Sequence, residues 1–162
     1  MINFKHKDIE KGFTLIELMI VVVILAVLVA VMLPSYQQSI QKARRADVMD
    51  ALTDCAAVQA RNYSAESPPT YLDEDELIDD VLCNPIGGAL TSKEGYYTLT
   101  VGDQSACTTG PTRWCFLLTA QAAPGSTQLS DDQCATWTID YRGRKTSVDA
   151  GGTDTTEFCW RN

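Results

Sequence analysis

The feature that most constrains this chain is an apolar run close to its beginning. From Phe13 to Leu33 the run contains only two polar residues, Thr14 and Glu17. About 20 consecutive apolar residues span the hydrocarbon core of a bilayer, so the sequence predicts a membrane-spanning helix over residues 13–34. A carboxylate in lipid is unfavourable by about 2.5–3.5 kcal/mol. Glu17 therefore needs something that offsets this penalty.

The residues before the run do not have the pattern of an ordinary secretory signal. The segment formed by residues 1–12 is short and polar. A signal peptide would have its cleavage site after the apolar run, near small residues. Here Pro34 follows the run directly. Positively charged residues tend to stay in the cytoplasm, and three lysines lie in residues 1–12. The expected orientation therefore has residues 35–162 outside.

Cysteine usage supports the same orientation. All six cysteines follow the apolar run, at Cys55, Cys83, Cys107, Cys115, Cys134 and Cys159. An even number in a small exported domain indicates a disulfide framework. No two of them have the C-x-x-C spacing of a redox motif or a zinc site, and no metal or cofactor is expected.

After Pro34 the pattern becomes that of an amphipathic helix. Apolar residues recur at spacings of three and four, at Met49, Leu52, Ala56, Ala60 and Tyr63, with Val48 and Cys55 beside them. The polar positions are Lys42, Arg44, Arg45, Asp47, Asp50, Asp54 and Arg61. We expect one helix over residues 14–64, about 75 Å long, ended by Ser67–Thr70. Proline removes a helical hydrogen bond, so a kink is expected at Pro34.

The rest of the chain has the signals of a loop followed by strands. A short helix is expected within Tyr71–Leu82. The strands are expected at Tyr96–Val101, Trp114–Ala122 and Ala135–Asp140, and a hairpin turn around Gly143 leads into a fourth. The predicted fold class is α+β, with an antiparallel sheet of about four strands on the amphipathic half of the helix. Disulfides would compensate for its small core.

The stretch KGFTLIELMIVVVILAVLVAVMLPSYQ resembles the amino-terminal signature of type IV prepilins. It has a glycine (Gly12), an aromatic residue (Phe13), a glutamate four residues after the aromatic (Glu17) and an apolar run that reaches Pro34. CATWTIDYRGRKT and the final CWR are similar to the carboxyl-terminal region of PilE-type pilins. The resemblance implies a structural subunit of a type IV pilus, with a PilE-type minor pilin as the nearest kind.

The resemblance also implies a mechanism of processing and assembly. A prepilin peptidase would cut between Gly12 and Phe13, remove residues 1–12 and methylate the new amine of Phe13. Subunits would then leave the inner membrane, with the help of the pilus assembly machinery there, and pack their apolar helices into a filament with other pilin subunits. Glu17 would pair with the Phe13 amine of a neighbouring subunit. Pairing makes a buried charge far less costly, which answers the question that Glu17 raises.

The implied location and roles follow from this mechanism. Before assembly the subunit would cross the inner membrane once, with its carboxyl terminus in the periplasm, and afterwards it would lie in an extracellular pilus. Such a pilus would serve adhesion, twitching motility or DNA uptake. The resemblance favours a Cys134–Cys159 pair, which would also hold a Gly-rich end of the chain. Cys107–Cys115 would close a loop of hairpin size, and Cys55–Cys83 would tie the connecting loop to the helix.

Other interpretations of the same residues stay open. They are the major pilin of the filament, a type II secretion pseudopilin, and a membrane-tethered DNA- or ligand-binding module. Glu17 alone also fits a single-pass anchor with this residue at the membrane interface. A net charge of −8 argues against general affinity for nucleic acid, so DNA enters as a partner only through uptake.

Three further groups of residues carry weaker signals. The sole histidine, His6, lies in the leader, so the mature chain can hold no Ser-His-Asp or Cys-His arrangement, and we expect no enzyme. Asp73–Asp80 is acidic but lacks the alternating ligands and glycine of an EF-hand loop, which favours a solvated acidic face over a calcium site. The cations of Tyr141–Lys145 fit a hairpin turn better than a phosphate-binding patch for DNA uptake.

Overall fold

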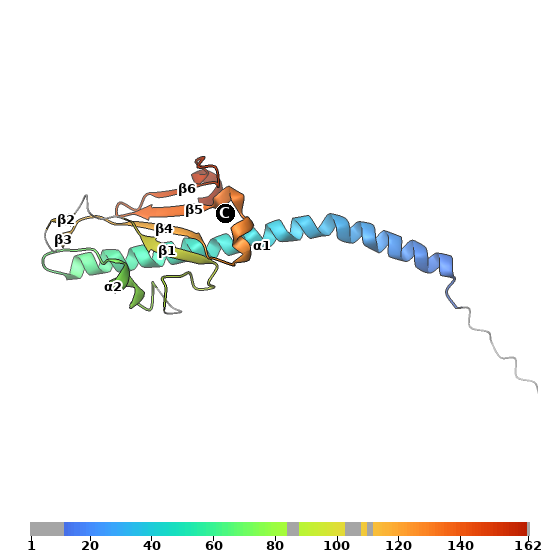
Figure 1. Cartoon of the computed structure of the whole chain (residues 1–162), viewed down its shortest axis with the longest axis horizontal. Coiled ribbons are helices and arrows are strands. Elements are labelled where there is room, and N and C mark those ends of the chain that lie inside the picture. The colour runs from blue at the N-terminus through green and yellow to red at the C-terminus, as the bar shows by residue number, and fades with distance from the viewer. Residues whose placement is uncertain (1–11, 84–87, 103–107, 110–111, 162) are drawn as a thin grey trace, which may run out of the picture. The chain divides into compact units, whose positions relative to one another are not determined.

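The computed structural model describes residues 12–83, 88–102, 108–109 and 112–161, and at residues 33–35, 108–109 and 112 the backbone alone. The chain divides into two compact units, residues 1–39 and 40–162, and each is described by itself. In chain order the elements are α1 (Leu15–Ala65), α2 (Glu74–Ile78), β1 (Tyr97–Val101), β2 (Thr108–Thr109), β3 (Thr112–Arg113), β4 (Leu117–Ala122), the 3-10 helices η2 (Thr127–Ser130) and η3 (Asp132–Cys134), β5 (Thr136–Asp140), β6 (Lys145–Val148) and α3 (Thr156–Trp160) (Figure 1).

Helix α1 begins and ends within one residue of the predicted bounds. In the first unit its large apolar side chains are all exposed as far as Met32, as expected of a segment that is covered by lipid or by other helices. It is long and apolar enough to cross a membrane. The helix continues through Pro34, and the kink expected there stays a prediction.

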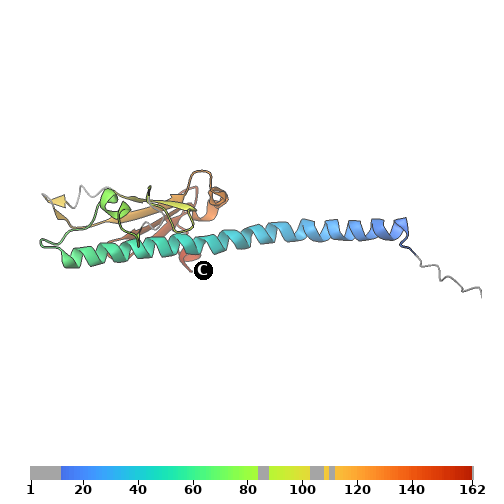
Figure 2. The same cartoon turned by 90° about the horizontal axis from the view of Figure 1, so that it is seen from below.

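The second unit contains the predicted four-stranded antiparallel sheet, in the order β1-β4-β5-β6. Figure 2 shows the α1 segment of this unit lying along one face of the sheet. The fold class is therefore α+β, as predicted. Strand β4 pairs with β1 and with β5, although neither is its direct neighbour in the sequence. Strands β2 and β3 lie between β1 and β4 in the chain, and η2 and η3 lie between β4 and β5.

Three details differ from the prediction. Strand β4 begins at Leu117 rather than Trp114, because its partner strands β1 and β5 end at Val101 and Asp140. A small pair of strands, β2 and β3, was not predicted. The carboxyl-terminal end forms α3, where the Asp154 carboxylate accepts a hydrogen bond from the Thr156 N–H (2.8 Å) in the first turn.

The buried stripe of α1 is rotated from the predicted one. Ala60 is exposed, and Met49, Ala56 and Tyr63 are only partly buried. The fully buried residues of this helix are Val48, Leu52, Cys55, Val58 and Gln59, and Arg45 is buried one turn earlier. Against them pack Tyr97 and Leu99 of β1, Leu118 and Ala120 of β4, and Trp137 and Ile139 of β5. The core therefore includes two long polar side chains of α1.

Candidate functional site

The residues of the predicted processing site lie at the start of the described chain. Gly12 and Phe13 precede α1, and the Phe13 side chain is 87 % exposed. Glu17 lies in the first turn of α1, where its backbone N–H donates to Thr14 Oγ1 (3.3 Å). No ion pair joins its carboxylate to another side chain among the residues that the structure describes. Glu17 is exposed.

Two disulfides link segments that are distant in the sequence. Cys55 of α1 is bonded to Cys83, and Cys134 of η3 is bonded to Cys159 of α3. These are the two pairings expected for these four residues. Cys115 is also disulfide-bonded, and its predicted partner Cys107 lies outside the described residues. The Cys107–Cys115 pair therefore stays a prediction.

The acidic segment Asp73–Asp80 has a structural role. The Asp73 carboxylate accepts from the Glu76 N–H (3.0 Å), and the Glu76 carboxylate accepts from the Asp73 N–H (2.9 Å), which forms a capping box at the start of α2. Arg113 donates to both carboxylates. Within the described part of the chain no group of three His, Cys, Asp or Glu side chains is arranged to hold a metal ion.

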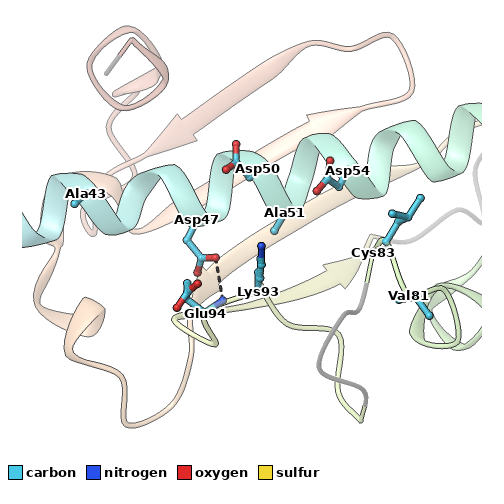
Figure 3. Close-up of a pocket in the computed structure, with 10 residues that line it drawn as sticks. Ala43, Asp47, Asp50, Ala51, Asp54, Val81, Cys83, Lys93 and Glu94 are labelled. Carbon is cyan, nitrogen blue, oxygen red and sulfur yellow. Dashed lines mark hydrogen bonds between the residues drawn. The ribbon is translucent and has the colours of Figure 1, made fainter.

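A second acidic surface is a groove of about 670 Å³ between α1 and the loops that follow α2. Asp47 accepts a hydrogen bond from the Glu94 N–H (3.1 Å) on one side of it, and Lys93 lies close by (Figure 3). Asp50 and Asp54 also line it, so carboxylates outnumber cations. This groove would repel a polyanion such as DNA.

The hairpin turn between β5 and β6 gathers the opposite charge. Arg142, Arg144 and Lys145 are all exposed there, and Gly143 takes a positive φ of 75°, which glycine adopts most readily. The Arg142 guanidinium lies 5.1 Å from the ring centroid of Tyr141. The Lys145 Nζ lies 4.7 Å from the ring centroid of Trp160. Contacts of this kind are attractive and limit the directions in which the cations point.

Asp140 organises this turn. Its Oδ1 accepts from the backbone N–H groups of Arg142 and Arg144 (2.9 Å each), and its Oδ2 accepts from Arg144 Nε (2.7 Å). Burial alone would raise the pKa of Asp140, but the N–H donors and the positive charge of Arg144 outweigh it and hold the pKa below its ordinary value. The carboxylate is thus committed to the turn, and the side chains of Arg142 and Lys145 form no ion pair with a carboxylate of the described residues.

The hairpin prediction for Tyr141–Lys145 is therefore correct, and the same turn also presents exposed cations. What the sequence did not reveal is that the aromatic rings of Tyr141 and Trp160 lie beneath two of them. Trp160 is 15 residues from Lys145 in the chain, and α3 brings it beside β6.

Comparison with known proteins identifies the chain's relatives. Residues 34–138 match the family described as "Type IV minor pilin ComP, DNA uptake sequence receptor", and residues 8–33 match the prokaryotic N-terminal methylation motif. Fimbrial protein Q of Moraxella bovis is 36 % identical over 84 residues, which cover 51 % of this chain and 54 % of that protein. The chain thus spans about half the length of this curated relative.

Two further similarities involve shorter or more distant matches. "Prepilin peptidase-dependent protein D" of Escherichia coli K12 is 48 % identical over 42 residues, which cover 26 % of this chain and 29 % of that protein. The solved structure of a type IV pilin from Shewanella oneidensis is 20 % identical, with a TM-score of 0.41, and covers 65 % of this chain and 89 % of that chain. The match over residues 34–138 spans more than half of the sequence. The chain therefore belongs to the family of type IV minor pilins described as ComP, the DNA uptake sequence receptor.

Proposed function

We propose that this type IV pilus subunit is made as a prepilin, cut between Gly12 and Phe13 by a prepilin peptidase and methylated on the Phe13 amine. The match of residues 8–33 to the N-terminal methylation motif supports this proposal. So does the exposure of Phe13 immediately before α1. One of the similar proteins is named for its dependence on prepilin peptidase. Mass spectrometry of the native protein tests it: the chain should start at Phe13 with one added methyl group, and an assembled chain that still starts at Met1 contradicts it.

Assembly with other pilin subunits follows the same scheme. Before assembly, residues 13–34 cross the inner membrane and residues 35–162 lie in the periplasm, where the inner-membrane assembly machinery takes up the subunit. Glu17 then pairs with the Phe13 amine of a neighbouring subunit. The exposed apolar side chains of this segment support the proposal, since they need lipid or neighbouring helices around them. Lipid is as apolar as the helices, so the ion pair gives the transfer into the filament its direction.

Within the pilus we propose that this subunit binds DNA during uptake. The observation that carries the proposal is the cation-rich β5–β6 turn on a chain whose net charge is −8. Most of the affinity of proteins for DNA comes from phosphate contacts by lysine and arginine. Arg142 and Lys145 are exposed and lie over aromatic rings, so little conformational entropy is lost when they contact phosphates. The description of the family, a DNA uptake sequence receptor, supports the same proposal.

Binding of end-labelled genomic fragments from the host organism to the full-length chain in detergent tests this function. The wild-type chain should bind, and binding should weaken as salt rises. Arg142→Gln/Lys145→Gln should weaken binding to all fragments alike, and each phosphate that is no longer neutralised should reduce the salt slope by about one. Lys93→Gln, in the acidic groove, removes one positive charge away from the turn and should bind as the wild type does. A wild-type chain that leaves DNA free at low salt contradicts the proposal.

A further inference from the structure

The outer face of the sheet, opposite α1, carries an ordered row of threonines. Cross-strand pairing places Thr100 of β1 opposite Thr119 of β4, Thr119 opposite Thr138 of β5, and Thr138 opposite Thr146 of β6. Every strand of the sheet thus contributes one threonine to a continuous row. The neighbouring residues Leu99, Leu118 and Ile139 point into the core, so the row lies on the side away from α1.

A second row runs parallel to the first, two residues further along each strand. Thr98 lies opposite Gln121, and Gln121 lies opposite Thr136. Thr91 extends this row through an isolated bridge to Thr98. At the other end Thr136 lies opposite Val148, which an isolated bridge joins to Asp154. The Gln121 amide donates to the Thr136 hydroxyl (3.1 Å), so the row is held in a fixed order. We call the two rows together the threonine face.

The threonine face is accessible, and its first row is uncharged. Thr100, Gln121 and Thr146 are exposed, and the other members are partly exposed, so none of the segments that the structure describes covers the rows. Lysine, arginine, aspartate and glutamate make up 21 % of the chain, yet none of them belongs to the first row, and the second row has only Asp154, at its end. Threonine is a good strand former, and the solvated face of an antiparallel sheet is ordinarily polar. The lack of carboxylates in the first row distinguishes this face from the acidic groove beside α1.

The threonine face is continuous with the basic β5–β6 turn. Asp140 follows Thr138 by two residues along β5, so it lies on the same face, and its carboxylate is bound by Arg144 Nε at 2.7 Å. The Asp140 carboxylate, which lies next to the first row on β5, is therefore neutralised by the exposed guanidinium of Arg144. A polyanion that reaches the turn can extend along the first row without meeting an unpaired negative charge among the residues of that row.

We propose that the threonine face is the surface along which the sugar–phosphate backbone of duplex DNA lies, with the β5–β6 turn attracting it. This inference rests on the proposed DNA-binding function and assigns a surface to it. Serine, threonine and glutamine side chains are regular phosphate and sugar contacts in protein–DNA complexes. Hydroxyls in the rows repeat at about 4.8 Å between strands and about 6.7 Å along a strand, which offers several donors to neighbouring phosphates. Antiparallel sheet faces are among the elements that dock on duplex DNA.

Substitutions on the first row test the inference in the full-length chain in detergent. Thr100→Val/Thr119→Val removes two hydroxyls but keeps the β-branched shape that suits a strand. It should weaken binding of the labelled genomic fragments about tenfold, because the variant can no longer donate these hydrogen bonds to charged acceptors. Thr119→Glu should weaken it further, since it places a negative charge beside the backbone. Thr53→Glu, at an exposed position of α1, makes the same change in net charge and should alter the dissociation constant by less than about twofold.

The outcomes separate this inference from the function on which it rests. If both sheet variants, with intact disulfides and wild-type circular dichroism, bind as the wild type does while Arg142→Gln/Lys145→Gln binds weakly, DNA contacts the turn alone and the inference is wrong. If Thr53→Glu weakens binding as much as Thr119→Glu, net charge and not location matters, and the inference is also wrong. If the wild-type chain binds no DNA, both proposals are wrong. Should Thr119→Glu fail to fold, the valine variant decides.

Discussion

Arg45 and Asp131 form a buried ion pair across 86 positions of the chain. Nε and Nη2 of the guanidinium each lie 2.7 Å from a different carboxylate oxygen. Gln128 Nε2 donates to the same carboxylate (2.8 Å). Arg45 is 2 % exposed and Asp131 5 % exposed, so removal of one partner leaves the other charge in the core. The pair attaches η2 and η3 to α1 by charge-assisted hydrogen bonds.

The first prediction concerns this pair. Arg45→Met should lower the free energy of unfolding by about 3–5 kcal/mol, because it leaves Asp131 buried without its partner. Urea unfolding followed by near-ultraviolet circular dichroism measures the change. Arg61→Met is the matched control on the same helix. Arg61 pairs with Asp80 at 2.9 Å but is 60 % exposed, and its loss should change stability by less than about 1 kcal/mol.

A double variant adds a second test of the same account. Arg45→Met/Asp131→Leu removes both charges, so it should be more stable than Arg45→Met alone. The account is wrong if Arg45→Met is no more destabilising than Arg61→Met.

The second prediction concerns Gln59, a buried amide on α1. Its Nε2 donates to Leu72 O (2.8 Å) and its Oε1 accepts from Leu72 N (2.7 Å). Gln59→Leu removes the hydrogen-bond partners of both the Leu72 N–H and the Leu72 carbonyl. It should destabilise the domain by about 1–3 kcal/mol for each of these two groups that is left without a partner. Thermal unfolding measures it, and Gln121→Leu on the exposed sheet face is the control. An equal effect of both substitutions would show that the Leu72 backbone finds water instead.

The third prediction concerns the carboxyl-terminal disulfide. Cys134 and Cys159 are separated by 25 positions, and closing a loop of this size stabilises a fold by about 3 kcal/mol in the chain-entropy model. Cys134→Ser/Cys159→Ser should leave α1 folded and in the membrane but make Tyr141–Phe158 sensitive to protease. Limited proteolysis with mass spectrometry of the fragments measures this. Equal resistance with and without the bond would show that packing alone holds the loop.

The fourth prediction concerns Glu17. Glu17→Val should leave membrane insertion intact or improve it, since the unfavourable carboxylate is gone. Its incorporation into sheared pili should fall sharply, because the Phe13 amine of the neighbour loses its partner. Immunoblots of the membrane and pilus fractions measure both. Glu66→Val, which removes an exposed carboxylate directly after the last residue of α1, should assemble normally. Normal incorporation of Glu17→Val would contradict the charge-pair account.

The fifth prediction concerns pH and Asp140. The folded state lowers the pKa of this carboxyl, so its contribution to stability is present above the unfolded pKa and is lost as pH falls through the folded pKa. Asp140→Asn should therefore destabilise the domain at neutral pH. As the pH falls, the stability of this variant should decrease less than that of the wild type. Thermal midpoints measured between neutral pH and about pH 3 test this. Parallel profiles for the two proteins would show that Asp140 does not contribute.

The predictions from sequence succeeded where a signal is local. The apolar run from Phe13 and the helix periodicity after Pro34 depend on neighbouring residues, and α1 agrees with them to within one residue at each end. The strands and the turn at Gly143 follow from alternation and from a glycine with positive φ. The predicted strand bounds were wrong where the extent of a strand depends on its pairing with other strands. Trp114–Phe116 have strand-forming side chains, but β1 and β5 do not extend beside them in the part of the chain that the structure describes.

The sequence by itself determined the long helix with its apolar first part, the motif at Gly12, Phe13 and Glu17, and the α+β class, because length, periodicity and motif are properties of contiguous residues. Only the tertiary structure decided that Arg45 and Gln59 are buried, since their partners come from segments distant in the chain. It alone also decided the threonine face. The sequence does not show which threonines are neighbours in the sheet. The row exists only because the strand register aligns Thr100, Thr119, Thr138 and Thr146 across four strands.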